Sequence, residues 1–255
     1  MGDRPDGIVL DMEGVLHVDW QAIDGAAEAV RKLREAGIEL AILTNTTGKT
    51  REAIAERLAP MGLEFPPERI VTAASAAADH LRRQHAGSRV FALVEGGMSG
   101  DLDGIDLVDD PSDAQVVLLG GPDEGWTYGR LNAVFRRLME GVPLVAMQRN
   151  RWWPTVDGPS LDAGMFVSGL EFSAQIEATV IGKPSPGIYK DACRLLGVGP
   201  SEAMMVGDDL ESDLPPAREI GMRTCLVRTG KGATFPAGAD VDLDLPALAA
   251  LPAAL

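Results

Sequence analysis

Cysteine, aromatic residues and long apolar runs are all scarce in this 255-residue sequence. Its two cysteines, Cys193 and Cys225, lack CxxC spacing, so we expect neither a disulfide framework nor a cysteine metal site. No stretch approaches the roughly 18 consecutive apolar residues of a membrane span, and residues 1–6 contain no apolar signal region. We therefore expect a cytoplasmic protein with no membrane partner.

Basic residues are also few, because 23 Lys and Arg stand against 38 Asp and Glu, which gives a net charge of −15. Nucleic acid binding requires a basic face, so we expect no nucleic-acid partner. An anionic substrate would need local positive charge from a lysine or a metal ion, against the overall field. The length allows either one large domain or two smaller ones.

Four polar segments are present, each directly after a strand-like apolar run. They are Asp11–Gly14 after residues 8–10, Thr44 and Asn45 after 41–43, Gly182–Pro184 after 179–181, and Gly207, Asp208 and Asp213 after 203–206. In a parallel α/β sheet such positions are the carboxyl ends of strands, where these folds bind ligands. The pattern therefore predicts that four strand ends converge on one crevice.

Strand-like and helix-like segments alternate at both ends of the chain, which predicts an α/β fold with a parallel sheet. The middle has its own strand–helix rhythm. We therefore expect a core of residues 1–73 and 181–255 with an inserted α/β cap domain at 74–180. The expected strands are 8–10, 38–43, 70–71, 89–94, 115–119, 142–147, 204–206 and 224–227. The expected helices are 23–36, 50–58, 75–84, 131–139, 188–196 and 215–220, with a short final helix packed by Leu243, Leu245, Leu248 and Leu251.

The polar segments together supply what phosphoryl transfer needs. A carboxylate such as Asp11 can attack phosphorus to form an aspartyl-phosphate. Asp11 and Asp208 offer oxygen ligands for Mg²⁺, and Lys183 offers positive charge. Taken singly, each segment is better explained as a turn, a helix cap or a solvated loop than as a functional site. The combination of all four is what points to a phosphate site.

The motifs Asp11-x-Glu13-Gly-Val, Thr44-Asn45, Gly182-Lys183-Pro184 and Gly207-Asp208-x4-Asp213 resemble those of the haloacid dehalogenase superfamily. The position of the insert resembles class IIA, the NagD-like branch with a type II cap. The strings 43–50, 161–171 and 180–186 resemble the phospholysine phosphohistidine inorganic pyrophosphate phosphatase group. The resemblance implies a Rossmann-like core and a Mg²⁺-dependent phosphatase that acts on a small phosphorylated metabolite, phosphoramidate or pyrophosphate through an aspartyl-phosphate.

The resemblance also implies a role for each site residue. Asp11 would be the nucleophile and a metal ligand, joined by Asp208 and by the backbone carbonyl of Glu13. Asp213 would orient the metal's waters or Lys183, and the cap would close over the site and select the leaving group. The phosphoryl group would be bound by Thr44, Asn45, Thr46 and Lys183.

Glu13 departs from the pattern, because most phosphatases of this superfamily have a general-acid Asp there and the resembled group often has Ser. Glutamate is one methylene longer, and misplacement by about an ångström can cost on the order of 10²-fold in rate. Glu13 is therefore either a working general acid or the mark of a weakly catalytic or non-catalytic phosphometabolite-binding protein. A phosphotransferase is a further alternative, favoured if the cap excludes water.

Two further features have open interpretations. The adjacent Trp152 and Trp153 would line the substrate pocket, pack the core of the cap, or form the face of a homodimer. His17 lies six residues after Asp11, close enough to border the site, and the sequence offers no partner for it.

Overall fold

The computed structural model describes residues 4–97, 100–155 and 158–255 and forms two compact units. The core unit comprises Met1–Thr44, Arg51–Val71 and Lys183–Leu255, and the insert unit comprises Asn45–Thr50 and Thr72–Gly182. The predicted division assigns residues 45–50 to the core, whereas the compact units group them with the insert. Residues 1–3 of the N-terminal stretch considered above lie outside the described residues.

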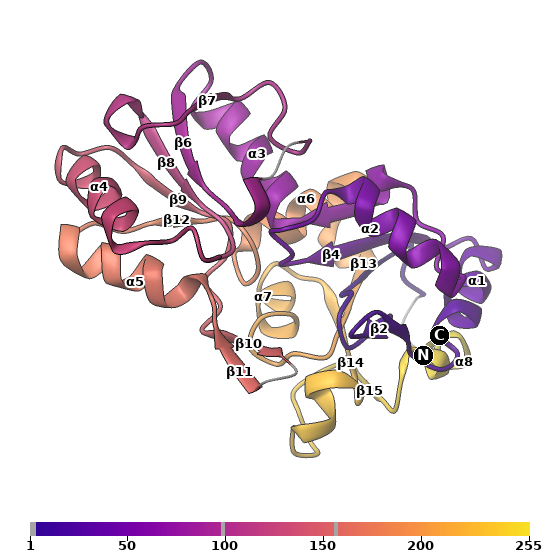
Figure 1. Cartoon of the computed structure of the whole chain (residues 1–255). Coiled ribbons are helices and arrows are strands. Elements are labelled where there is room, and N and C mark those ends of the chain that lie inside the picture. Colours follow the sequence, from indigo (N-terminus) through magenta and orange to yellow (C-terminus); the bar gives the residue numbers. More distant parts are fainter. Residues whose placement is uncertain (1–3, 98–99, 156–157) are drawn as a thin grey trace. The chain divides into compact units, whose positions relative to one another are not determined.

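The core unit is built on a six-stranded sheet in the order β15-β14-β13-β1-β4-β5. Its central strand β1 pairs in parallel with β13 on one side and β4 on the other, so that Gly7 lies opposite both Ala203 and Glu39. The sheet thus joins strands from the two ends of the chain, as the colours of Figure 1 show. The strands are β1 (Gly7–Leu10), β4 (Glu39–Thr44), β5 (Ile70–Thr72), β13 (Ala203–Gly207), β14 (Arg223–Val227) and β15 (Leu243–Leu245).

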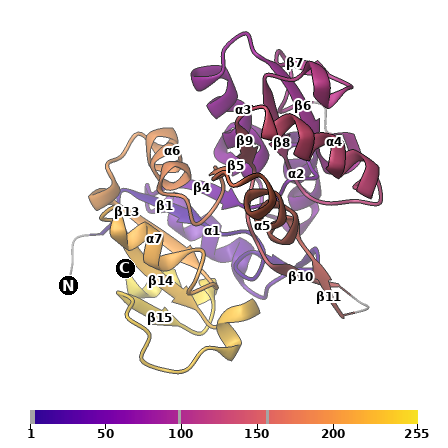
Figure 2. The ribbon, with the colours of Figure 1, turned by 90° about the vertical axis from the view of Figure 1, so that its left-hand side faces the viewer.

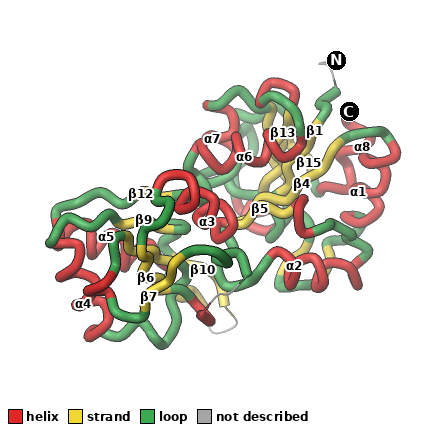
Figure 3. The backbone as a smooth tube through the Cα atoms, turned by 90° about the horizontal axis from the view of Figure 1, so that it is seen from above, coloured by secondary structure: helices red, strands yellow, loops and turns green. Residues whose placement is uncertain are grey.

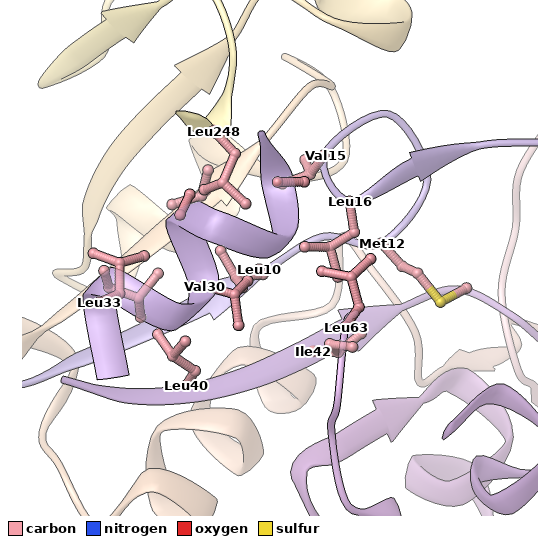
Figure 4. Packing of buried hydrophobic residues seen from close by; sticks show 14 of the residues in the cluster. Leu10, Met12, Val15, Leu16, Val30, Leu33, Leu40, Ile42, Leu63 and Leu248 are labelled. Atoms are coloured by element: carbon pink, nitrogen blue, oxygen red, sulfur yellow. The ribbon is translucent and has the colours of Figure 1, made fainter. Parts of the chain in front are cut away.

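Helices cover both faces of this sheet (Figure 3). On one face lie α1 (Ala26–Glu35) and α8 (Leu251–Ala254), and on the other lie α6 (Pro186–Leu196) and α7 (Leu214–Glu219); α2 (Arg51–Leu58) follows β4 in the chain. Val30 and Leu33 of α1 pack with Leu10, Leu40 and Ile42 of the strands (Figure 4). Each such side chain contributes roughly 1.5–3 kcal/mol on burial, which explains why the central strands β1 and β13 are apolar along their length.

The insert unit has a second sheet, in the order β12-β9-β8-β6-β7. Helix α3 (Ala73–Gln84) shares one apolar cluster with this sheet, and α4 (Tyr128–Met139) and α5 (Ala163–Ala174) share another. An antiparallel hairpin of β10 (Trp152–Thr155) and β11 (Gly158–Leu161) precedes α5 (Figure 2). The sheet strands are β6 (Arg89–Leu93), β7 (Asp106–Val108), β8 (Val116–Leu119), β9 (Leu144–Ala146) and β12 (Thr179–Val180). The predicted fold class, a Rossmann-like parallel core with an inserted α/β domain, is confirmed.

The final segment differs from the prediction. Leu243 and Leu245 lie on strand β15, which pairs with β14, and not on a final helix. Their spacing of two residues suits a strand, where alternate side chains share a face. Leu248 and Leu251 do lie on short helical turns, and both are buried. Among the described residues, none of the helices is both long enough and apolar enough to cross a membrane.

Candidate active site

Two buried aspartates follow the adjacent central strands of the core sheet. Asp11 follows β1 and Asp208 follows β13, and they are 7% and 4% exposed. The backbone N–H of Asp11 donates to the carbonyl of Val206 at 2.9 Å, so the strand pairing continues to the aspartate itself. The strand order reverses between β1 and β13, which is the position where open α/β sheets bind ligands. The two strand ends thus place the carboxylates of Asp11 and Asp208 at the same edge of the core sheet.

Lys183 reaches this site by a route that the sequence did not indicate. The run before it forms β12, which pairs with β9 of the insert sheet, with Thr179 opposite Val145. The prediction of four converging core strand ends is therefore wrong for this segment. Lys183 lies instead on the connection into α6, where its Nζ donates to Asp11 Oδ1 at 2.6 Å and to Asp213 Oδ1 at 2.7 Å. A single buried ammonium joins the two carboxylates.

Negative charge is in excess at this cluster. Burial, followed by the charges of Asp11 and Asp213, raises the pKa of Asp208 to about 8. Burial also raises the pKa of Asp213, to about 7, although Lys183 opposes the shift. Burial lowers the pKa of Lys183, but the two carboxylates outweigh it and raise that pKa above its ordinary value. Lys183 therefore stays protonated. Its single positive charge does not balance the three carboxylates of the cluster.

The donor set fits a divalent cation. One carboxylate oxygen from each of Asp11, Asp208 and Asp213 lies within 4.8 Å of the others. Carboxylate oxygens are the ligands that Mg²⁺ and Ca²⁺ prefer. Burial first, and then repulsion between neighbouring carboxylates, raises the pKa of Asp208 and of Asp213, and a bound cation would offset both effects.

Asp213 is held on both oxygens by protein groups. Lys183 occupies Oδ1, and the backbone N–H of Asp209 donates to Oδ2 at 3.2 Å. A Cβ on Gly207 would lie 2.4 Å from Asp213 Oδ2, so only glycine allows the turn to wrap this closely. The buried hydroxyl of Tyr189 donates to the carbonyl of Ser212 and fixes the same turn from α6. Asp213 is thereby suited to an outer, orienting position.

Glu13 is exposed, and its carboxylate contacts residues a few positions later in the chain. Its carboxylate accepts a hydrogen bond from the Asp19 backbone N–H at 2.8 Å and lies 3.0 Å from Nδ1 of His17. Burial raises the pKa of Glu13, but the hydrogen bonds from His17 and Asp19 outweigh it, so that this pKa lies below its usual value. His17 is itself fully buried and stacks on Trp20, with ring centroids 4.6 Å apart. His17 Nδ1 thus lies beside Glu13, four residues earlier, a spacing that the sequence does display, and it also accepts a hydrogen bond from the Trp20 backbone N–H at 3.3 Å.

The candidate phosphate-binding residues are divided between the two units. Thr44 ends β4 in the core unit and is 5% exposed. Asn45 and Thr46 follow it but belong to the insert unit. There the Asn45 amide donates to Asn150 Oδ1 at 3.3 Å, within a polar chain that continues through Gln148 to the buried Asp162.

Trp152 and Trp153 lie on β10 of the hairpin and are 48% and 51% exposed. Side chains this exposed do not form the core of the insert unit, so that interpretation is wrong. Pocket lining and an interface between copies stay open as predictions.

Comparison with known proteins gives consistent matches. Residues 8–108 match a family model described as haloacid dehalogenase-like hydrolase, and residues 180–242 match one described as HAD-hydrolase-like. The chain is 36% identical over 224 residues to human haloacid dehalogenase-like hydrolase domain-containing protein 2, covering 88% of this chain and 84% of that one. It is 35% identical over 231 residues to phospholysine phosphohistidine inorganic pyrophosphate phosphatase of Danio rerio, covering 88% and 83%.

Solved structures agree with these matches. A p-nitrophenyl phosphatase from Archaeoglobus fulgidus superimposes with a TM-score of 0.91 at 27% identity, covering 99% of this chain and 100% of that one. NagD from E. coli K-12 shares the fold, with a TM-score of 0.84 at 24% identity over 96% of this chain and 97% of that one.

Proposed function

Because this chain belongs to the haloacid dehalogenase-like hydrolases, and within them to the NagD-like class IIA phosphatases, we propose that it hydrolyses a small phosphorylated metabolite through an aspartyl-phosphate on Asp11. The observation that carries the proposal is the Lys183 ammonium, buried between Asp11 and Asp213 at 2.6 and 2.7 Å. A surface ion pair would not need such burial, whereas a phosphoryl site needs fixed positive charge beside its nucleophile.

In the first step an oxygen of Asp11 attacks the phosphorus, a new O–P bond forms, and the bond to the leaving group breaks with its electron pair. Lys183 offsets negative charge on both the nucleophile and the transferred group. In the second step water attacks the phosphorus and gives a proton to the Glu13 carboxylate, and the bond between Asp11 and phosphorus breaks, which releases inorganic phosphate and regenerates the Asp11 carboxylate. Thr44, Asn45 and Thr46 are proposed to bind the phosphoryl oxygens. Each step needs charge neutralisation more than covalent chemistry from the protein.

Mg²⁺ is the proposed cofactor, held by Asp11, Asp208 and the backbone carbonyl of Glu13. When bound, it supplies positive charge that favours approach of the anionic substrate. Asp213, with both oxygens engaged by Lys183 and Asp209, is proposed to orient the lysine and the waters around the ion.

The hydrogen bonds that hold the Glu13 carboxylate favour substrates with leaving groups that need no proton. Its carboxylate is held by Asp19 and His17 and its pKa is lowered, so it is better suited to accept a proton from water than to donate one to a leaving group. We therefore favour substrates whose leaving group departs without a proton, namely a pyrophosphate or an already protonated phosphoramidate, over simple alkyl phosphates. The insert, proposed as a cap over residues 74–180, would select among them.

Phosphate release from a panel of phosphoanhydrides, phosphoramidates, aryl phosphates and alkyl phosphates tests the proposal, measured with Mg²⁺ and with EDTA. We expect metal-dependent release that is lost in Asp11→Asn and retained in Asp24→Asn, the same change at an exposed loop position. Release to an added alcohol instead of water would identify a phosphotransferase. Mg²⁺ binding without release from any compound would replace the phosphatase with a phosphometabolite-binding protein.

A further inference from the structure

We propose that residues 229–231, called here the clamp segment, position the Asp208 carboxylate and thereby set the affinity of the site for its divalent cation. This inference rests on the proposed cation site. It assigns a role to a segment that belongs to none of the four motifs and that follows a different strand, β14.

The clamp segment contacts both loops that carry the central aspartates. The backbone N–H of Lys231 donates to Asp208 Oδ2 at 2.7 Å. The hydroxyl of Thr229 donates to the carbonyl of Gly14, three residues after Asp11. One oxygen of Asp208 is thus held by the backbone of the clamp, which fixes the plane of the carboxylate, and we assign the other oxygen to the cation.

Two glycines make this geometry sterically possible. Gly230 has φ +51, and a Cβ there would lie 2.2 Å from Asp208 Oδ2 and 2.6 Å from Gly14 Cα. Gly14 has φ +82, and its Cβ would lie 2.0 Å from the same oxygen. The carboxylate therefore sits in a slot between two residues that have no side chain. Any methyl group on either side would displace it.

The clamp segment is itself braced from the rest of the core unit. The Arg228 guanidinium donates to the carbonyls of Phe235 and Pro236 at 2.6 and 3.1 Å, and it forms two bonds with Asp244 of β15 at 2.7 and 2.6 Å. The Lys231 ammonium donates to Asp209 Oδ2 at 2.6 Å. Because these contacts hold the clamp segment at both ends, it can fix the orientation of the Asp208 carboxylate. An unsupported loop would move together with the carboxylate.

Groups that orient metal ligands in this way affect affinity strongly, and their loss typically costs about 10–100-fold in metal binding. The clamp acts on Asp208 alone among the proposed side-chain ligands. Its loss should therefore weaken cation binding without unfolding the protein.

The first test compares Gly230→Ala with Gly238→Ala by calorimetric titration of the full chain with Mg²⁺. Gly238 has φ +86, and a Cβ added there would meet no atom within 4 Å, so it shares the backbone strain and lacks the clash. We expect the dissociation constant to rise about 10–100-fold in Gly230→Ala and to stay unchanged in Gly238→Ala, both measured below the melting temperature of the metal-free variant. Equal Mg²⁺ affinity in both would overturn the proposal.

The second test avoids any change in the backbone. Thr229→Val removes the hydroxyl that donates to Gly14 and keeps the side-chain shape, while Thr229→Ser restores the hydroxyl. We expect weaker Mg²⁺ binding in the valine variant and recovery in the serine variant, and identical binding in both would contradict the clamp. A wild-type chain that binds no Mg²⁺ would also overturn it. A chain that binds Mg²⁺ through the clamp but releases no phosphate would overturn only the proposed function.

Discussion

The imidazole of His17, on the short strand β2 (His17–Val18), lies 3.0 Å from the carboxylate of Glu13, in the loop that follows the proposed nucleophile. The Asp19 backbone donates to the same carboxylate. This loop therefore holds the acid–base candidate by two contacts, and the longer side chain of glutamate is what reaches them.

Glu13→Asp should separate substrates by their leaving groups. The shorter side chain gives up the contacts with His17 and Asp19 and becomes available to protonate a leaving group, a contribution of about 10²–10⁴-fold in general acid catalysis. We expect turnover of an alkyl phosphate to rise about tenfold or more and turnover of p-nitrophenyl phosphate to change little. Steady-state kinetics would measure the turnover of both substrates. Glu52→Asp, at an exposed position of α2, is the control. A parallel fall on both substrates would show that Glu13 itself is the tuned catalyst.

Lys183→Met should destabilise the protein and abolish turnover. It leaves the buried Asp11 and Asp213 without their shared cation, and breaking a buried ion pair typically costs about 3–5 kcal/mol. Urea unfolding would measure the loss, with Lys190→Met at an exposed position of α6 as the control. Equal stability of the two variants would contradict the assigned balance of charge.

Tyr189→Phe should loosen the turn that carries Asp213. The lost hydroxyl leaves the Ser212 carbonyl without this donor, at a cost of about 1–3 kcal/mol, and we expect turnover to fall several-fold. Tyr128→Phe, at a side chain that is 83% exposed, should change stability by no more than about 0.5 kcal/mol. Thermal and urea unfolding of the matched pair provide the comparison, and similar values for both would argue against a role for Tyr189.

Stability of the metal-free protein should fall as pH rises from about 4 to about 8. Asp208 and Asp213 have folded-state pKa values of about 8 and about 7 against an ordinary value of 3.8, so in this window the folded state binds protons that the unfolded state has lost. Each such proton contributes a slope of about 1.4 kcal/mol per pH unit. Urea midpoints in EDTA should therefore decline across the window, less steeply in Asp208→Asn. Added Mg²⁺ should stabilise the protein most near pH 8, where the carboxylates are ionised. Urea midpoints that do not change with pH in either the wild type or Asp208→Asn would refute the assigned pKa shifts.

The sequence predicts the central core strands because they are short apolar runs buried on both faces, as at residues 7–10 and 203–207. It also predicts that Asp11 and Asp208 meet, since parallel strands end at the same edge. It does not predict the sheet to which residues 179–180 belong, because so short a run carries no information about its neighbour. The sequence does not predict helix α5, because its apolar residues lie all round it.

The site contacts that the sequence does not predict involve loops. The contacts of Glu13 with His17 and of Lys231 with Asp208 depend on backbone conformations, including the left-handed Gly230, that periodicity cannot report. The candidate site was therefore predictable where regular strands place it, and its supporting contacts were not.

The pairing of β1 with β13 has a consequence for synthesis. Val9 and Met205 are neighbours in the sheet, yet the entire insert and α6 are translated between them. Long-range parallel pairing of this kind forms slowly, because the intervening chain must close a large loop first. A nascent chain displays Asp11 long before Lys183, Asp208 and Asp213 emerge from the ribosome, so the cluster of these four side chains forms only after residue 213 has been translated.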